Sequence, residues 1–313
     1  IPEISSNEHS SRILSAARKA LPKELEKRVT EFINSSDDAL KIDNQGNILW
    51  MESSIGRLLK GDDIYNPKVI LKSLDMLTND QISKIQKKCE KSISEIINKI
   101  LSDCLKLKNL KMIEDSKSDI EVELSSKVKA INFHVYEGIG CAFIKNIPFQ
   151  IKKIEDSDRL AIAKLGIRLG VDLIYLPVVL KPKVIKLKGI LWSIYNDQFC
   201  LENLPEDGRV NCQINHSINK DFYSFIGYIP CGKIGLRLDI YERLSALIRN
   251  EAKKPKFTIT ESMLSIAGAT KEDLKNFIVK TLKYNLVSNN NESDENVAEF
   301  YFQKKKYPKK QFF

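Results

Sequence analysis

The sequence has few histidines and no long apolar run. The first feature argues against a histidine-based catalytic or metal site, and the second argues against a membrane-spanning helix. Its three histidines, His9, His134 and His216, stand far apart among 313 residues, with no obvious catalytic or metal-binding partner. The apolar run from Leu173 to Leu180 is far shorter than the roughly 20 residues that a membrane-spanning helix needs. No charged start with an apolar core and a small-residue cleavage site marks a secretory signal. We therefore expect a globular, cytoplasmic protein without a membrane partner.

Closely spaced cysteine pairs are also lacking. The six cysteines lie far apart in the chain, at Cys89, Cys104, Cys141, Cys200, Cys212 and Cys231. A zinc ribbon or a redox dithiol needs cysteines in short, paired spacings. The nearest approach to a metal half-site is Cys212 with His216, in the stretch CQINH, and the other half would have to come from Cys231 alone. The spacing predicts free thiols and no metal site.

Motifs of an enzyme are missing as well. A phosphate-binding loop needs G-x-x-x-x-G-K-[ST], because backbone amides and the lysine together neutralise the phosphates. The nearest stretch, GRLLKGDD, has both glycines at the required spacing, but Asp62 and Asp63 replace the lysine and the hydroxyl residue. Neither a G-x-S-x-G elbow nor an H-E-x-x-H pair occurs. We predict no catalytic residue, and whether the chain has an enzymatic activity of its own stays open.

Basic residues are the most abundant feature that carries chemistry. Lysine and arginine number 50 against 41 acidic residues, which gives a formal net charge of +9. The last residues, YFQKKKYPKKQFF, hold five lysines and no acid, so the rest of the chain carries only +4. This balance suits a polyanionic partner but does not establish one.

Apolar periodicity predicts an α+β fold that is mainly α-helical. Helical spacing indicates two helices over residues 10–34, with a joint marked by Pro22. The pattern TNDQ at Thr78 is typical of a capping box, so we expect a long helix to about Ser102. Its lysines, from Lys84 to Lys91, form either a solvated face or a track for phosphates. Small β-hairpins are expected around the turns at residues 44–46 and 231–233, the second with strands over 222–229 and 234–238.

The C-terminal third resembles a helix-turn-helix or winged-helix core. In the stretch FTITESMLSIAGATKEDLKNFIVKTLKY, a short helix precedes Gly268, and Thr270 with Asp273 is placed to cap a second helix. Residues 297–302 are predicted as an edge strand. The predicted parts are N-terminal helices with a small β-hairpin over 1–65, a helical domain over 66–200, a small α+β, winged-helix-like domain over 201–285, and a polar linker with a basic tail over 286–313.

The central stretch IYLPVVLKPKVIKLKGILW combines apolar residues, two prolines and four lysines. Pro182 suits the first position of a helix, where its missing N–H costs nothing. The residue before each proline is pushed away from helical angles, so the run from Tyr175 to Leu180 is expected to be extended or turn-like. A helix over 183–195 should follow, with one buried face. Its lysines either solubilise a core helix or contact a polyanion.

This stretch carries a resemblance to a known family. KLGIRLGVDLIYLPVVLKPKVIKLKGILW resembles a signature in the C-terminal region of alphaproteobacterial superfamily 2 helicases related to the mitochondrial degradosome RNA helicase. Those proteins typically show R-x-G, then LP-x-LLKP, then a basic helix ending in LLW. The matching positions are Arg168, Gly170, Leu176, Pro177, Leu180, Lys181, Pro182, Leu191 and Trp192. ILWMESSIGRLLKGDD, FYSFIGYIPCGKIGLRLDIYERL and SMLSIAGATKEDLKNFIVKTLKY agree in order, so the resemblance covers roughly four-fifths of the chain.

The resemblance implies an accessory role. In that family the motor domains lie upstream and carry the phosphate loop, the acidic box and the arginines for ATP hydrolysis, none of which occurs here. The chain then follows the motor, extends its nucleic-acid path and supports its second domain. We expect ATP and magnesium to belong to the upstream motor, and no cofactor in this chain.

The function that this implies is that of an accessory nucleic-acid-binding region of an ATP-dependent RNA helicase. RNA is the expected partner and DNA the alternative, beside the upstream motor domains. Candidate contacts are Arg168, Lys181, Lys183, Lys186 and Lys188, and in the tail Lys304, Lys305, Lys306, Lys309 and Lys310. Aromatic residues among the tail lysines, namely Tyr301, Tyr307 and Phe312, are placed to stack on bases. The rival hypothesis is a protein–protein scaffold that docks an exonuclease or another RNA-processing partner, with incidental lysines.

Overall fold

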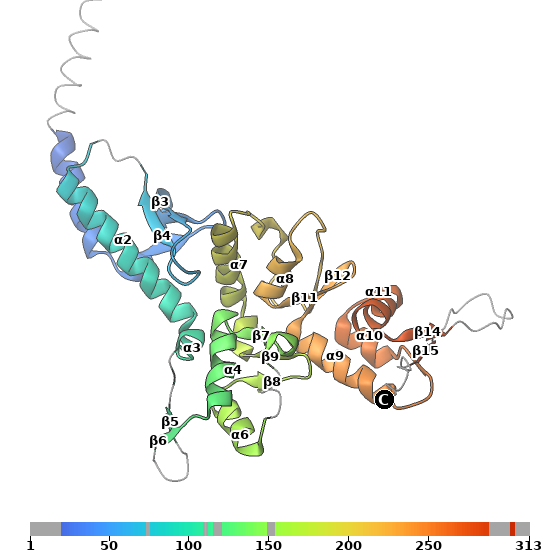
Figure 1. Cartoon of the computed structure of the whole chain (residues 1–313). Coiled ribbons are helices and arrows are strands. Elements are labelled where there is room, and N and C mark those ends of the chain that lie inside the picture. Colours follow the sequence, from blue (N-terminus) through green and yellow to red (C-terminus); the bar gives the residue numbers. More distant parts are fainter. Residues whose placement is uncertain are drawn as a thin grey trace, which may run out of the picture. The chain divides into compact units, whose positions relative to one another are not determined.

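Figure 1 shows the computed structural model of the chain. The structure describes residues 20–72, 76–108, 110, 112–114, 121–148, 154–287 and 301–303. Helices predominate and the sheets are small and antiparallel, so the prediction of an α+β fold with more helix than strand is confirmed. The chain divides into two compact units, Ile1–Lys99 with Ser193–Phe199, and Ile100–Trp192 with Cys200–Phe313.

The first unit contains a four-stranded antiparallel sheet in the order β1-β2-β3-β4. The strands are β1 (Leu40–Ile42), β2 (Asn47–Trp50), β3 (Ser53–Leu59) and β4 (Lys68–Leu71), and the short 3-10 helix η1 (Asp37–Ala39) precedes them. The predicted hairpin around residues 44–46 joins β1 to β2. Its turn forms because the Asp43 carboxylate accepts the amides of Gln45 and Asn47, each at 2.8 Å.

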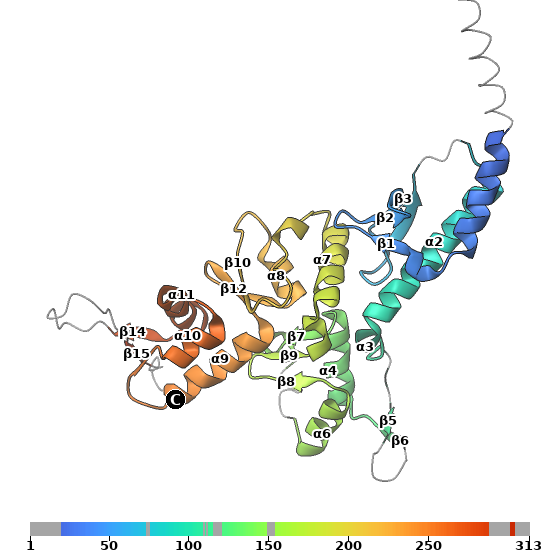
Figure 2. The same ribbon diagram turned by 180° about the vertical axis from the view of Figure 1, so that it is seen from behind.

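The long helix α2 (Asn79–Ile100) lies along this sheet, and the amide of Gln86 donates to the carbonyl of Val69 in β4 at 2.7 Å (Figure 2). The predicted capping box is confirmed: the backbone N–H of Thr78 donates to the Gln81 side chain at 3.0 Å, and the N–H of Gln81 donates to the Thr78 hydroxyl at 3.3 Å. Apolar side chains at helical spacing form its buried stripe, namely Ile85, Cys89, Ile93 and Ile97.

The N-terminal helix differs from the prediction. Residues 20–34 form one continuous helix, so Pro22 marks no joint within the described residues. The part of the prediction that covers residues 10–19 lies outside them. The predicted boundary after residue 65 falls between β3 and β4, which pair with each other, so the first unit extends to Lys99.

The second unit begins with a helical layer around a small sheet. Its helices are α3 (Ser102–Leu105), α4 (Ser126–Glu137) and α6 (Asp156–Lys164), with the 3-10 helix η2 (Ile144–Asn146). The sheet has the order β7-β9-β8, formed by β7 (Cys141–Phe143), β8 (Arg168–Leu169) and β9 (Leu173–Tyr175), and a separate hairpin pairs β5 (Met112–Glu114) with β6 (Glu121–Glu123).

The central stretch folds as its prolines predict. After β9 comes the 3-10 helix η3 (Pro177–Leu180), and α7 (Pro182–Asn196) begins at the second proline. The carbonyl of Lys181 accepts the amides of Val184 and Ile185 at 2.9 and 3.0 Å, which places Lys181 at the helix cap. From Ser193 onward, α7 belongs to the first unit.

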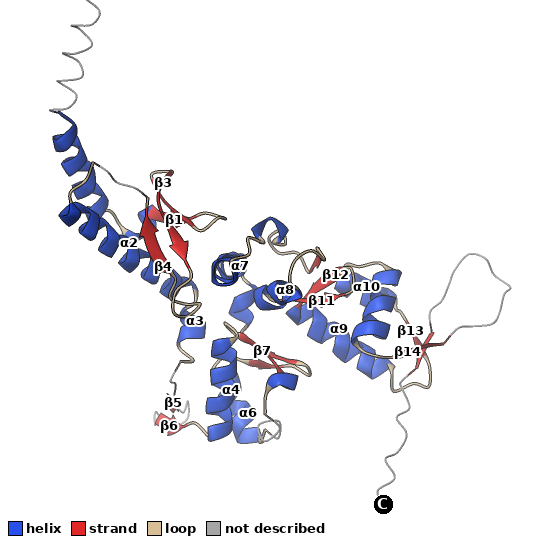
Figure 3. Cartoon of the chain, turned by 45° about the horizontal axis from the view of Figure 1, so that its top comes forward, coloured by secondary structure: helices blue, strands red, loops and turns tan. Residues whose placement is uncertain are grey.

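A second small sheet follows, in the order β10-β12-β11. The elements are η4 (Leu201–Asn203), β10 (Asn211–Gln213), α8 (Lys220–Ile226), β11 (Tyr228–Cys231) and β12 (Ile234–Arg237). The predicted hairpin exists, but residues 222–226 are helical rather than extended, and α8 packs against β11 (Figure 3). The helix forms because Asn219 caps its start and Gly227, at φ 95°, ends it, while Phe222 packs on Trp192 at 5.2 Å.

The last described part of the chain contains three α-helices, a π-helical turn and a three-stranded sheet in the order β13-β15-β14. The elements are α9 (Leu238–Glu251), β13 (Phe257–Thr258), α10 (Glu261–Ala267), α11 (Lys271–Asn276), the π-helical turn η5 (Phe277–Thr281), β14 (Asn285–Val287) and β15 (Tyr301–Gln303). The capping box of Thr270 with Asp273 is confirmed. The edge-strand prediction is wrong for β15, which pairs on both sides because its buried Phe302 packs on Phe257.

Candidate nucleic-acid interface

The first turns of α7 present three of the predicted lysines to solvent. Lys181, Lys183 and Lys186 are all exposed. They stand at the N-terminal end of a 15-residue helix, where free backbone N–H groups and the helix dipole already favour negative charge. Three added ammonium groups therefore make this end an electropositive surface.

These lysines differ from those of α2 in their partners. On α2, Lys84 pairs with Asp80 at 2.7 Å, and Lys91 pairs with Glu95 at 3.6 Å. The α2 lysines are therefore mostly neutralised, which favours their interpretation as a solvated face. Across the described residues, none of the three α7 lysines forms an ion pair with an acidic side chain.

Lys188 is a correction to the predicted site. Its side chain is fully buried, and its Nζ donates to the carbonyl oxygen of Ile139 at 2.9 Å and lies 5.1 Å from the centre of the Phe225 ring. Burial lowers the pKa of Lys188, because the charged form loses its hydration. This lysine therefore supports the core and presents no surface to a nucleic acid.

Arg168 comes from a different element than the lysines at the start of α7. Arg168 is exposed on β8, opposite Tyr175 of β9, and its side chain bonds to the Tyr175 hydroxyl. Burial raises the pKa of Tyr175 and is the largest influence on it. The tail lysines, Lys304, Lys305, Lys306, Lys309 and Lys310, lie outside the described residues, as do Tyr307 and Phe312. Tyr301 is half-buried in β15.

The first unit contains an aromatic and basic patch that the sequence did not reveal. The Arg57 guanidinium lies 5.0 Å from the centre of the Phe199 ring, and the Lys60 ammonium lies 4.3 Å from the centre of the Tyr195 ring. The side chain of Phe199 is 50% exposed, and that of Ile70 in β4 is 52% exposed. We call Arg57, Lys60, Tyr195 and Phe199 the stacking patch. Sequence reasoning missed it because its cations and its rings lie more than 130 positions apart.

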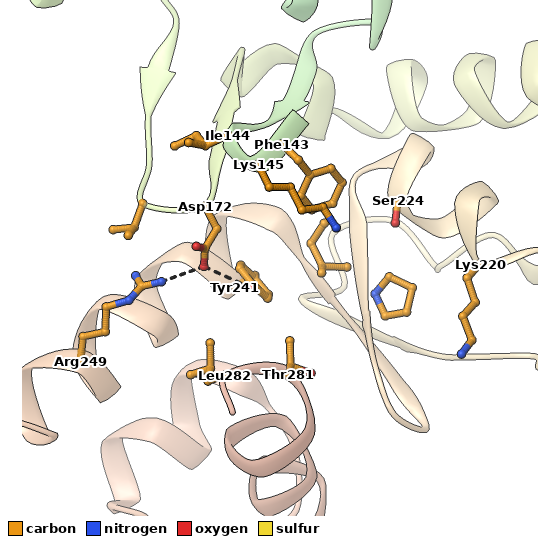
Figure 4. Close-up of a pocket in the computed structure, with 13 residues that line it drawn as sticks. Phe143, Ile144, Lys145, Asp172, Lys220, Ser224, Tyr241, Arg249, Thr281 and Leu282 are labelled. Atoms are coloured by element: carbon orange, nitrogen blue, oxygen red, sulfur yellow. Dashed lines mark hydrogen bonds and ion pairs between the residues drawn. The ribbon is translucent and has the colours of Figure 1, made fainter. Parts of the chain in front are cut away.

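A cleft of about 680 Å³ opens within the second unit (Figure 4). It is bounded by residues from β7 and η2, the β8–β9 turn, α8, β11, α9 and the end of η5. Asp172 lies on one side, where it accepts hydrogen bonds from Arg249 at 2.8 Å and from the Tyr241 hydroxyl at 3.3 Å. Burial is the main cause of the raised pKa of Tyr241, so its hydroxyl keeps its proton and can donate.

A buried carboxylate holds this side of the cleft in place. Glu242 of α9 accepts the backbone N–H groups of Val171, Asp172 and Leu173, at 2.8, 2.9 and 2.7 Å. A Cβ on residue 170 would lie only 2.5 Å from the carboxyl carbon of Glu242, which is too close. The turn can therefore approach α9 this closely only because residue 170 is glycine. The three bonds fix the β8–β9 turn on α9.

Metal and membrane readings find no support in the described part of the chain. No group of three or more histidine, cysteine, aspartate or glutamate side chains is placed there to hold a metal ion. Burial raises the pKa of Cys212 to about 11, so this thiol of the half-site considered above stays protonated at neutral pH. None of the described helices combines the length and apolarity needed to cross a bilayer.

Comparison of the chain with protein-family models, with curated proteins and with solved structures finds no match in any of the three.

Proposed function

We propose that this chain is an accessory nucleic-acid-binding region of an ATP-dependent RNA helicase whose motor domains are not part of it. The observation that carries the proposal is the cluster of Lys181, Lys183 and Lys186, exposed at the start of α7 without an acidic partner among the described residues. Three like charges held together repel one another, and bound phosphates neutralise them. The lysines in turn neutralise the phosphates and release the counterions condensed on the nucleic acid. RNA is the preferred partner and DNA the alternative.

The stacking patch supports a single strand rather than a duplex. Unpaired bases stack on exposed aromatic rings, while cations follow the backbone, and this combination is typical of single-strand binding surfaces. Phe199 offers an exposed ring, and Arg57 and Lys60 provide the cations. The link to a helicase rests on the resemblance of the stretch from Lys164 to Trp192 and of the three further blocks.

We propose further that the elements from α9 to β15 form a winged-helix-like module, which begins and ends later in the chain than the predicted domain over residues 201–285. The order helix, strand, helix, helix, strand, strand, from α9 to β15, is that of winged-helix domains, and the sheet order β13-β15-β14 agrees with it. Between β14 and β15 the sequence carries four acids, Glu292, Asp294, Glu295 and Glu299, and no basic residue. An acidic stretch repels the phosphates of a duplex, so we infer that the module acts as a support rather than as a reader of duplex DNA.

The test compares two variants with the same change in net charge. The triple variant Lys181→Gln/Lys183→Gln/Lys186→Gln removes the proposed contacts, and Lys84→Gln/Lys91→Gln/Lys99→Gln removes three exposed lysines of α2 that pair with acids. Binding to a short single-stranded RNA is measured over a range of salt concentrations. Each lost phosphate contact lowers the salt slope by about 0.7, so the first variant should lose about 2 and the second close to 0.

Two results would overturn the proposal. Equal slopes for both triple variants would show that only net charge matters, and undetectable binding at low salt would favour the protein scaffold that docks an RNA-processing partner. Turnover of ATP by this chain alone would contradict the assignment of the motor to another part of the protein.

A further inference from the structure

The cleft of the second unit has an excess of positive charge. Lys145 and Lys220 line it from η2 and α8, both are exposed, and neither forms an ion pair within the described part of the chain. Arg249 also lines it, but its charge is balanced by Asp172, 2.8 Å away. The two uncompensated ammonium groups therefore favour an anion in the cleft.

An aromatic ring lies directly beside one of these cations. The Nζ of Lys145 is 5.0 Å from the centre of the Phe143 ring, and both side chains face the cleft in Figure 4. Phe143 is half-buried, so part of its ring is accessible. An anionic group that binds Lys145 consequently brings whatever it is attached to against an apolar, planar surface.

The remaining walls combine apolar and hydroxyl groups. Ile229 and Pro230 of β11 contribute apolar surface, and Ser224 of α8 and Thr281 of η5 contribute hydroxyls. The volume of about 680 Å³ lies within the range of about 300–1,000 Å³ that is typical of small-molecule sites. A ligand with an anionic end, a hydroxyl-bearing middle and a flat body matches this set of walls.

The frame of the cleft is fixed before any ligand binds. The Asp172–Arg249 pair and the three backbone bonds to Glu242 join the β8–β9 turn to α9. A preformed wall lowers the entropy lost on binding, whereas Lys145 and Lys220 at the rim are free to adjust.

We propose that this cleft binds one nucleotide unit, with its phosphate at Lys145 and Lys220 and its base against Phe143. The unit is either a free mononucleotide or the terminal nucleotide of a single strand, because both offer the same phosphate, sugar and base. The cleft shares no residue with the lysines of α7 or with the stacking patch, so it does not depend on the function proposed above. Inorganic phosphate can bind the two lysines but carries no base. The difference between its affinity and that of the mononucleotide therefore measures the contribution of the base.

The test is calorimetric titration of the full chain with adenosine 5′-monophosphate, with inorganic phosphate and with a short single-stranded RNA. We expect Lys145→Gln/Lys220→Gln to weaken binding of the mononucleotide, of the strand or of both by about tenfold or more, since about 1.4 kcal/mol corresponds to each tenfold change. The control Lys84→Gln/Lys87→Gln makes the same charge change on α2. Ser224→Trp, which fills the cleft, should abolish the same binding.

The titrations also identify the source of the nucleotide unit. Binding of the mononucleotide identifies a free nucleotide, and lysine-dependent binding of the strand alone identifies a strand end. The proposal is overturned if neither ligand depends on Lys145 and Lys220, or if inorganic phosphate binds as tightly as the nucleotide. Loss of strand binding on substitution of the α7 lysines, with mononucleotide binding retained, concerns only the proposed RNA-binding function.

Discussion

The side-chain nitrogen of Lys188 lies 2.9 Å from the carbonyl oxygen of Ile139, inside the core of the second unit. Ile139 follows the end of α4 at a positive φ of 44°, which β-branched residues rarely adopt. Its carbonyl has no role in the helix, and the lysine supplies a donor to it. A charged group is expensive to bury, so this contact makes the stability of the unit depend on pH.

We expect Lys188→Met to remove a rise of stability with pH. An unfolded lysine titrates near 10.4, and burial lowers the pKa of Lys188 in the folded state, so the unfolded chain binds more protons below pH 10. Stability therefore increases as the pH rises from the lowered pKa of the folded state toward about 10.4, by at most about 1.4 kcal/mol per pH unit. The nearby Cys104 acts in the other direction: burial raises the pKa of its thiol to about 11, whereas an unfolded cysteine titrates at about 8.5, so its contribution to stability falls above about pH 8 in the parent and in Lys188→Met alike. The effect of Lys188 is therefore the difference between the two pH profiles.

The measurement is the free energy of unfolding in urea at a series of pH values, followed by the fluorescence of a single tryptophan. The chain contains Trp50 in the first unit and Trp192 in the second, so Trp50→Phe leaves Trp192 to report on the second unit. The control is Lys186→Met, which changes an exposed lysine on the same helix. If both lysine variants follow the pH dependence of the parent, Lys188 is not the group responsible.

Glu242→Ala should destabilise the second unit by at least about 3 kcal/mol, because three buried backbone N–H groups lose their charged acceptor. Unfolding is again followed through Trp192. Glu261→Ala, at an exposed position of α10, should stay within about 0.5 kcal/mol of the parent. A similar effect of both substitutions would mean that the β8–β9 turn is held by other contacts.

Asp37 predicts a pH dependence of the same sign in the first unit, but in the acid range. Hydrogen bonds from Lys88 and Ser92 hold the pKa of Asp37 well below its usual value, with the Lys88 bond contributing most. The unfolded carboxyl binds protons first, so stability is fully present above about pH 4 and falls as the pH drops further.

Asp37→Asn should remove this contribution, so that the free energy of unfolding of the first unit falls less steeply as the pH drops below about 4. Trp50, whose ring packs edge-on against Phe32 at 5.2 Å, reports on this unit in a Trp192→Phe background. The control is Asp62→Asn, where the carboxylate is almost fully exposed. An equally steep fall in the Asp37→Asn variant would contradict the role of the Lys88–Asp37 pair.

Phe199→Ala should weaken binding of single-stranded RNA by about 1–3 kcal/mol, the usual effect of removing one base-stacking ring. Phe133 is the matched control, because it is 54% exposed on α4, compared with 50% for Phe199. Fluorescence anisotropy at fixed salt measures both variants. Equal loss from Phe133→Ala, or no loss from Phe199→Ala, would remove the stacking patch from the proposed interface.

Short-range signals in the sequence determined the local structure. The capping boxes at Thr78 and Thr270, the turn at residues 44–46 and the start of α7 at Pro182 all follow the residue pattern. Each depends on groups within four positions of one another, so the sequence alone contains the atoms that form the bonds. The exposure of Lys181, Lys183 and Lys186 agrees with the same amphipathic pattern.

Only the tertiary structure decided which surfaces those elements present. Lys188 lies on a helix with three exposed lysines at its start, yet the packing of Ile139 and Phe225 around it buries it. The sequence pattern predicts a strand over residues 222–226, but these residues form a helix whose Phe222 packs on Trp192. The stacking patch and the cleft of the second unit each join segments far apart in the chain, because burial and proximity depend on how elements pack, which no local pattern encodes.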